Sequence, residues 1–127
     1  MKIIICGAYG IGTHLAKMLS RNHEDITLID EDDERLAQIG SDFDLLTAQA
    51  SPSSIKALRE AGAEHADLFI AVTPEESLNI TSCVLAKALG AKKTVAKISN
   101  SEYTAPELQD FFTGLGVSSL IYPEKLA

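Results

Sequence analysis

The sequence predicts an α/β fold, a doubly wound parallel sheet of six strands with helices on both faces. Short β-branched apolar runs alternate with helical patterns along the chain. Such alternation implies parallel strands joined by right-handed crossovers. The first run, residues 2–6, is apolar from Ile3 onward, which is typical of a strand buried on both faces. We expect the strand order 3-2-1-4-5-6 in a three-layer αβα arrangement.

Chain length and charge narrow the functional classes. The 127 residues favour one domain, over residues 1–127, and suffice for a core without disulfides or a structural metal. There are 18 acidic and 11 basic side chains without a Lys/Arg cluster, so we expect no nucleic-acid partner. No His or Cys spacing predicts a metal site. No apolar run is long enough to insert into a membrane.

The first half of the chain should alternate three strands with three helices. The strands are expected at residues 2–6, 25–29 and 43–46, and the helices at 11–21, 32–39 and 52–61. Ser51 suits the cap of the third helix, Pro52 its first turn and Gly62 its end. The first helix should turn four apolar side chains toward the core: Ile11, Leu15, Met18 and Leu19.

The second half should add three strands and two helices. The strands are expected at residues 68–72, 94–98 and 118–122, and the helices at 75–89 and 105–113. Phe111 and Phe112 are adjacent, so helical spacing cannot turn both inward, and an exposed one would mark a subunit interface. The long helix should turn four residues inward: Leu78, Val84, Leu85 and Ala88.

A glycine-rich turn, Gly7-Ala8-Tyr9-Gly10-Ile11-Gly12, joins the first strand to the first helix. At this junction the pattern is typical of a Rossmann-like nucleotide-binding turn. Gly7 should permit the tight turn and Gly12 the close packing of helix on strand, while the helix N-terminus offers N–H groups to a phosphate. The usual third-place glycine is Tyr9 here, so either Gly10 restores backbone freedom in a shifted loop or Tyr9 covers the site. The alternative is a tight connection with no ligand.

Two polar residues each follow a predicted strand. Asp30 lies 18 residues after Gly12, where a carboxylate hydrogen-bonds ribose hydroxyls and repels a 2′-phosphate, which favours NAD(H) over NADP(H). Asp30 could instead cap the next helix, although Asp32 or Asp33 could do this equally well. Thr73 could meet ribose or phosphate, or form a turn before Pro74, and both interpretations stay open.

Several segments together carry a family resemblance: residues 2–12, 28–30, 57–62, 66–73, Asn79, 85–87, 94–97 and Tyr103. Through them the chain resembles the N-terminal domain of TrkA-type and other RCK proteins, which are cytosolic regulators of potassium channels and transporters. The resemblance implies that the domain binds NAD(H), or ATP, ADP or AMP, without transforming it, and that binding changes oligomer packing to gate ion flux. The implied partners are a second copy, in a homodimer or higher oligomer, and a membrane-embedded potassium transporter or channel subunit. The implied location is cytoplasmic, at the inner face of the membrane.

The resemblance also implies a ligand site and exposes departures from it. The family usually has Gly-Asp after the third strand, where this chain has Ala48 and Gln49. The family's basic residue after the fifth strand is often Arg, where Lys97 supplies a point charge without the bidentate fork. Residues 122–127 would lead into a further helix of a longer protein. The expected ligand-binding residues are Gly7, Tyr9, Gly10, Ile11, Gly12, Asp30, Gln49, Ala50, Thr73 and Lys97.

Two other functional classes use the same features. A cofactor-binding domain of an NAD-dependent oxidoreductase would share the turn but also needs an acid–base group. Tyr122 and Lys125 straddle Pro123 rather than lying one helical turn apart, and no catalytic constellation is apparent, so we expect no enzyme. The third class is an interaction module that has lost its ligand, for which the unusual Tyr9 and Gln49 argue.

Overall fold

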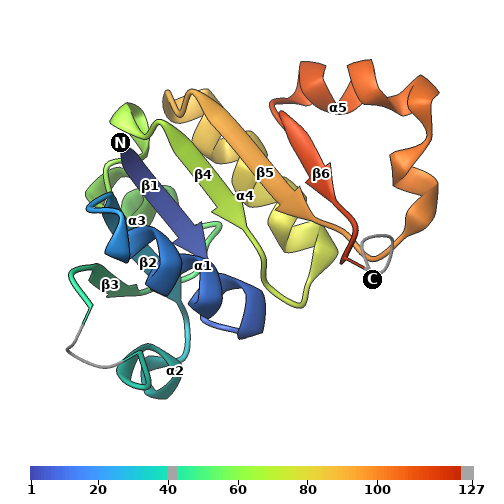
Figure 1. Cartoon of the computed structure of the whole chain (residues 1–127). Helices are drawn as coiled ribbons and strands as arrows, with labels where there is room; N and C mark the ends of the chain where they lie inside the picture. Colours follow the sequence, from blue (N-terminus) through green and yellow to red (C-terminus); the bar gives the residue numbers. More distant parts are fainter. Residues whose placement is uncertain (40–42, 124–127) are drawn as a thin grey trace.

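The computed structural model describes residues 1–39 and 43–123, which form one parallel six-stranded sheet between helices (Figure 1). The strand order is β3-β2-β1-β4-β5-β6, and every neighbouring pair is parallel. The predicted fold class and strand order are therefore confirmed. Residues 124–127, expected to lead into a further helix, lie outside the described residues. The strands are β1 Lys2–Cys6, β2 Asp25–Asp30, β3 Leu46–Gln49, β4 Leu68–Ala71, β5 Lys93–Lys97 and β6 Ser119–Ile121. The α-helices are α1 Gly10–Arg21, α2 Asp33–Ala37, α3 Ile55–Glu60, α4 Glu76–Leu89 and α5 Gln109–Leu115.

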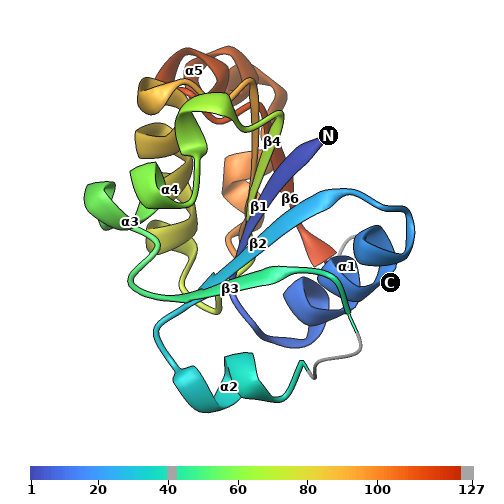
Figure 2. The same cartoon turned by 90° about the vertical axis from the view of Figure 1, so that its left-hand side faces the viewer.

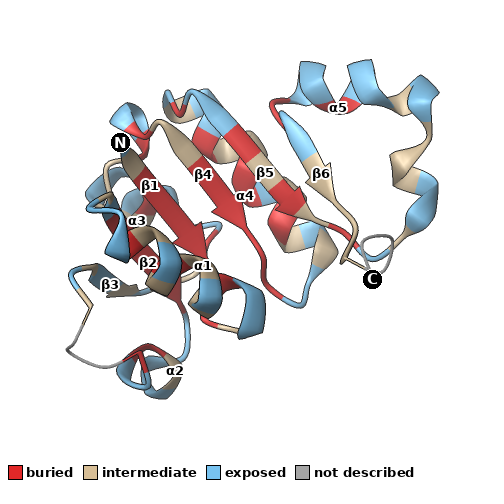
Figure 3. Cartoon of the chain, viewed as in Figure 1, coloured by how far each residue is buried: buried red, intermediate tan, exposed pale blue. Residues whose placement is uncertain are grey.

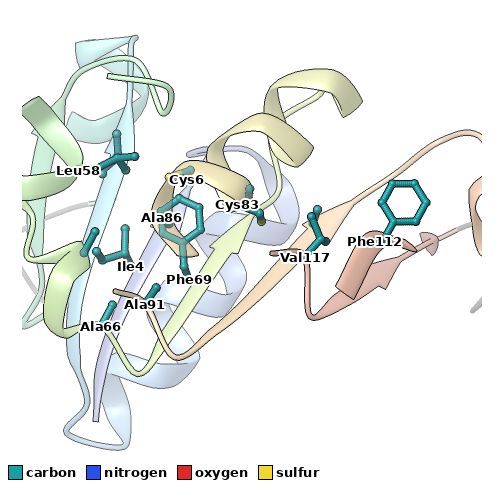
Figure 4. Packing of buried hydrophobic residues seen from close by; sticks show 14 residues of the cluster. Ile4, Cys6, Leu58, Ala66, Phe69, Cys83, Ala86, Ala91, Phe112 and Val117 are labelled. Carbon is teal, nitrogen blue, oxygen red and sulfur yellow. The ribbon is translucent and has the colours of Figure 1, made fainter. Parts of the chain in front are cut away.

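The central strands are buried on both faces, because alternate side chains supply two cores. In β1, Ile3 and Ile5 join the core beneath α1 and α2, whereas Ile4 and Cys6 join the core beneath α3, α4 and α5. Figure 2 shows α1 on one side of the sheet and α3 and α4 on the other, and Figure 3 shows the buried centre of β1, β4 and β5. Figure 4 shows Cys6 and Cys83 within the second core, where burial raises the pKa of Cys83 to about 12.

Three sequence predictions of element bounds were wrong. The last helix starts at Gln109 rather than at 105, because Pro106–Leu108 forms a separate 3-10 helix. The third strand lies at Leu46–Gln49 rather than 43–46, because parallel pairing with Thr27–Asp30 of β2 selects that register. The third helix starts at Ile55, not at Pro52. Ser54 caps it by accepting a hydrogen bond from Ala57 N at 3.1 Å, while the Ser51 carbonyl accepts from Ser54 N in the preceding turn.

The buried face of α1 differs from the predicted one. Ile11 is 39% and Met18 is 42% exposed. Gly12, Ala16 and Ser20 are buried instead. Leu15 and Leu19, the other two predicted residues, are half-buried and pack against the core beneath α1, as predicted.

The long helix α4 also buries small and polar residues. Asn79, Ser82, Cys83 and Ala86 are buried, whereas Ala88 is exposed, contrary to prediction, and Leu78, Val84 and Leu85 are half-buried. Near the C-terminus, α5 continues through Gly114 and ends at Gly116, which has a φ of 109°. Phe112 is 7% and Phe111 57% exposed, so the prediction that one of the pair is exposed is confirmed.

Candidate functional site

The glycine-rich turn leaves β1 at the carboxyl edge of the sheet and enters α1. Gly7 has a φ of 113°, and a Cβ there would lie 3.0 Å from backbone atoms of Val72 and Thr73. A Cβ on Gly12 would lie 1.8 Å from the Gly7 carbonyl oxygen. Both glycines therefore have the structural roles that the sequence predicted, a tight turn at Gly7 and close helix packing at Gly12.

The middle of the turn does not need glycine. Tyr9 is the N-cap residue of α1, with φ −108° and ψ 175°, an extended conformation open to any residue. A Cβ on Gly10 would meet nothing within 4 Å. The Tyr9 side chain makes no capping hydrogen bond, so its ring is available for other contacts. The first-turn N–H groups of α1 open toward the same edge of the sheet.

Asp30 fastens the turn to the end of β2. Its carboxylate is almost fully buried, at 5% exposure. Oδ2 accepts a hydrogen bond from Ala8 N at 2.7 Å, and Oδ1 accepts one from Asp32 N at 2.8 Å. The cap of α2 is Asp32, whose Oδ1 accepts from Glu34 N at 2.9 Å. The interpretation of Asp30 as the helix cap was therefore wrong, and Asp30 is a bridge between the turn and the segment after β2.

A cavity of about 720 Å³ opens beside the turn. Of the predicted ligand residues, Tyr9, Asp30, Gln49 and Thr73 line it. The other six predicted residues do not line it: Gly7, Gly10, Ile11, Gly12, Ala50 and Lys97. The lining also holds residues that the sequence did not place in the site: Glu31, Asp32, Asp33, Ser51, Pro52, Pro74, Glu75 and Leu78. Five of the lining residues are acidic: Asp30, Glu31, Asp32, Asp33 and Glu75.

The end of β4 is locked to α4 by one buried amide. Asn79 is 1% exposed, and its Oδ1 accepts from Thr73 Oγ1 at 2.7 Å and Thr73 N at 3.0 Å. Its Nδ2 donates to the carbonyl oxygens of Thr73 and Lys97 at 3.0 and 2.9 Å. The Thr73 hydroxyl also accepts from Glu75 N at 3.2 Å. This network fixes the turn before α4, and contact of the hydroxyl with a ligand stays a prediction.

Arg35 of α2 was missed by the sequence analysis. Its guanidinium carbon Cζ lies 3.8 Å from the centre of the Tyr9 ring, a cation–π contact between α2 and the glycine-rich turn. Asp32 Oδ2 lies 3.6 Å from Arg35 Nε. Because the contact joins residues 26 positions apart, no local sequence pattern signals it. The one hint is a basic residue directly after an acidic run.

Glu76, in the first turn of α4, holds the loop that follows β5. Its Oε2 accepts from Ser99 N and Asn100 N, each at 2.7 Å, and these bonds lower the pKa of the carboxyl. A depressed pKa in the folded state contributes stability that is present above the ordinary glutamate pKa and is lost as the pH falls through the folded value.

We therefore expect Glu76→Gln to flatten the acid side of the stability profile. The unfolding midpoint in urea, measured from pH 6 to pH 3, should fall less steeply below about pH 4 in the variant than in the parent chain. Glu107→Gln, a change at an exposed glutamate, is the control and should leave the profile unaltered. Parallel profiles for the Glu76 variant and the parent would contradict the role of these bonds.

No group of three His, Cys, Asp or Glu side chains in residues 1–39 and 43–123 is arranged to hold a metal ion. No helix in the same residues has the length and apolar character needed to cross a bilayer.

Comparison with known proteins places the chain among potassium-uptake relatives. The TrkA-N domain family matches residues 3–123. The Trk system potassium uptake protein TrkA of Haemophilus influenzae is 41% identical over 99% of this chain, and a TrkA homolog of Archaeoglobus fulgidus is 37% identical over 98%. This chain spans 28% of the length of each of these relatives.

Solved structures share the fold at low identity. The TrkA-N domain of the inner membrane protein ybaL from Escherichia coli superposes with a TM-score of 0.83 at 13% identity, covering 98% of this chain and 89% of that one. The GsuK channel bound to NAD gives 0.75 at 14%, covering 94% and 21%. The Shewanella denitrificans Kef C-terminal domain in its AMP-bound form gives 0.70 at 18%, covering 95% and 70%. From the family match and the identity to TrkA proteins over nearly all of this chain, the chain belongs to the TrkA-N domain family.

Proposed function

We propose that this chain is a nucleotide-sensing regulatory domain of a potassium uptake transporter or channel. The observation that carries the proposal is the glycine-rich turn fastened by Asp30 beside a cavity at the carboxyl edge of the sheet. Open α/β sheets bind ligands at this edge, where the strand order reverses, here between β1 and β4. Relatives named as potassium uptake proteins, and similar folds described as bound to NAD or AMP, support both parts of the proposal.

The proposed ligand has free ribose hydroxyls, either NAD(H) or an adenine nucleotide. A phosphate would lie against the N–H groups of Gly10 and Ile11, with the macrodipole of α1 behind it. Gln49 lines the cavity and donates from Nε2 to the Glu31 carbonyl at 3.2 Å. In the proposed complex its Oε1 would accept a hydrogen bond from the base. The predicted contacts at Ala50 and Lys97 would require a ligand that reaches beyond the cavity lining.

The proposal includes oligomeric regulation without catalysis. Phe111 and Leu115, at 57% and 43% exposure, leave an apolar face on α5 that suits pairing with a second copy. Ligand binding would alter that packing and thereby the flux through a membrane-embedded partner at the inner face of the membrane. The proposal assigns the cavity, the glycine-rich turn and the carboxylates around them to binding a nucleotide, and to no chemical step on it.

Calorimetric titration with NAD, NADH, AMP, ADP and ATP tests the proposal. We expect saturable binding of at least one nucleotide, and a change in sedimentation behaviour on adding it. Asp30→Asn should weaken that binding by about tenfold or more, since one acceptor of the carboxylate becomes a donor. Asp110→Asn, at an exposed position on α5, is the control.

Each alternative gives a different result in this experiment. An interaction module without a ligand would give no heat with any of the five nucleotides, which would overturn the proposal. A cofactor domain of an oxidoreductase would bind NADH and oxidise it when small carbonyl substrates are added, so the absorbance of NADH would fall. Binding without turnover is the outcome that supports a sensor.

A further inference from the structure

We infer that the Tyr9–Arg35 contact makes this cavity selective for a nucleoside monophosphate over nucleotides that carry a second phosphate. The inference rests on the proposed function and narrows the ligand class of the same site. It concerns two side chains that come from different elements, the glycine-rich turn and α2. Three features of the described residues carry it: the place of Tyr9, the way its ring is held, and the charge of the cavity.

The first feature is the place of Tyr9 at the third position of the turn. A glycine at this position normally lets the backbone approach a pyrophosphate. The backbone of Tyr9 is extended and imposes no need for glycine, so a bulky side chain is accommodated here without strain. The ring borders the cavity. A phosphate at the N–H groups of α1 is therefore still possible, while a second phosphate crossing the turn would meet the ring.

The second feature is that the ring is held in place. Arg35 Cζ lies 3.8 Å from the ring centre, and Asp32 Oδ2 lies 3.6 Å from Arg35 Nε. Asp32 is itself fixed as the N-cap of α2 by the N–H group of Glu34. To swing away from the turn, the Tyr9 side chain would have to give up its contact with the guanidinium. The obstruction is therefore coupled to the folded position of α2.

The third feature is the charge of the cavity. Five acidic residues line it, and no Lys, Arg or His is among its lining residues in the part of the chain that the structure describes. The second phosphate of ADP adds negative charge next to these carboxylates, and this repulsion grows in a partly desolvated site. The pyrophosphate of NAD carries no more charge than the phosphate of AMP, so NAD is disfavoured by the Tyr9 ring alone. Arg35 contacts the lining residue Tyr9 and lies close to Asp32, so it is a cation next to these acidic lining residues. Its guanidinium offers hydrogen-bond donors to one phosphate group.

The expected ranking is measured by calorimetry in EDTA with adenosine, AMP, ADP and NAD. The parent chain should bind AMP about tenfold or more tightly than ADP or NAD, and more tightly than adenosine, because one charge-assisted contact is gained and the second phosphate is obstructed. Tyr9→Gly should bring ADP and NAD to within about threefold of AMP by removing the obstruction. Arg35→Gln should weaken AMP binding by about tenfold and leave adenosine binding unchanged, because it removes one charge-assisted contact and keeps the N–H groups of α1.

Arg59→Gln provides the matched control for Arg35→Gln. Arg59 is an exposed arginine of α3 with an ion pair to Glu64 at 3.5 Å, and it does not line the cavity. Its loss should leave the ligand ranking unchanged. Thermal unfolding of each variant establishes that the chain is folded, and the ranking of the parent chain depends on no variant.

The outcomes separate this inference from the proposed function. Equal or tighter binding of ADP or NAD by the parent chain would overturn the selectivity while leaving the nucleotide site intact. An unchanged ratio of AMP to ADP in Tyr9→Gly, with the variant folded, would remove Tyr9 as its cause. Absence of binding by all four compounds and by ATP would overturn the proposed function itself, and the inference with it.

Discussion

Replacement of Gly12 by alanine should lower the free energy of unfolding by about 3 to 4 kcal/mol, near the upper end for overpacking of a rigid site. The added Cβ would lie 1.8 Å from the Gly7 carbonyl oxygen and 3.1 Å from the Val72 side chain. The carbonyl belongs to the turn itself and cannot move without shifting the end of β1. Urea denaturation followed by far-UV circular dichroism measures the loss.

Gly10→Ala is the matched control for this experiment. Both glycines lie in the first turn of α1, but a Cβ on Gly10 meets nothing within 4 Å. Its free energy of unfolding should stay within about 1 kcal/mol of the parent, since alanine suits a helix better than glycine. Equal losses in the two variants would show that the tight packing of α1 on the turn is not what limits substitution at Gly12.

Asp30→Ala should lower the free energy of unfolding by about 3 kcal/mol, since two hydrogen bonds to a buried carboxylate are lost. Ala8 N and Asp32 N both donate to this carboxylate. The Ala8 N–H group would be left buried without its partner. Denaturation in urea at pH 7 measures this effect in the absence of any ligand.

Asp33→Asn is the control that distinguishes the structural role of Asp30 from the effect of removing one negative charge from the cavity. Asp33 lines the same cavity and lies at the start of α2, but its side chain accepts no hydrogen bond from the described residues. Its loss should cost less than about 1 kcal/mol, the usual size of a helix-dipole contribution. If Asp30→Ala were no more costly than Asp33→Asn, the bridge between turn and β2 would not be a major source of stability.

A structural role for Asp30 changes how its effect on binding is interpreted. The sequence analysis assigned Asp30 to the ribose, whereas both carboxylate oxygens already accept backbone N–H groups. Each oxygen can still accept a further bond, so contact with ribose stays a prediction. A loss of affinity in an Asp30 variant could therefore come from a displaced turn as well as from a lost ribose contact. Measuring stability and affinity on the same variant separates the two causes.

The candidate site was predictable where it depends on local pattern. Gly7 and Gly12 are recognisable from the sequence because both are required where a strand meets a helix, and this junction is only a few residues long. Asp30 is recognisable because it ends the neighbouring strand of a fold whose strand order the alternation predicts. Arg35 was missed because its partner, Tyr9, lies in a different element. The group of five acidic residues around the cavity was missed because its members come from separate segments. Asp33 follows β2 and Glu75 follows β4, on opposite sides of the point where the strand order reverses.

The sequence by itself determined the six-stranded parallel order and the place of the turn, because apolar periodicity and glycine requirements are encoded over a few neighbouring residues. Only the tertiary structure decided which side chains of α1 are buried against the sheet. The sequence favoured four apolar residues of α1; Leu15 and Leu19 are half-buried against the core, whereas the fully buried positions are Gly12, Ala16 and Ser20. Tertiary contacts likewise pair the Asp30 carboxylate with the Ala8 N–H group and the Tyr9 ring with the Arg35 guanidinium. These pairs form only after β1, β2 and α2 have been brought together, so no pattern within one segment specifies them.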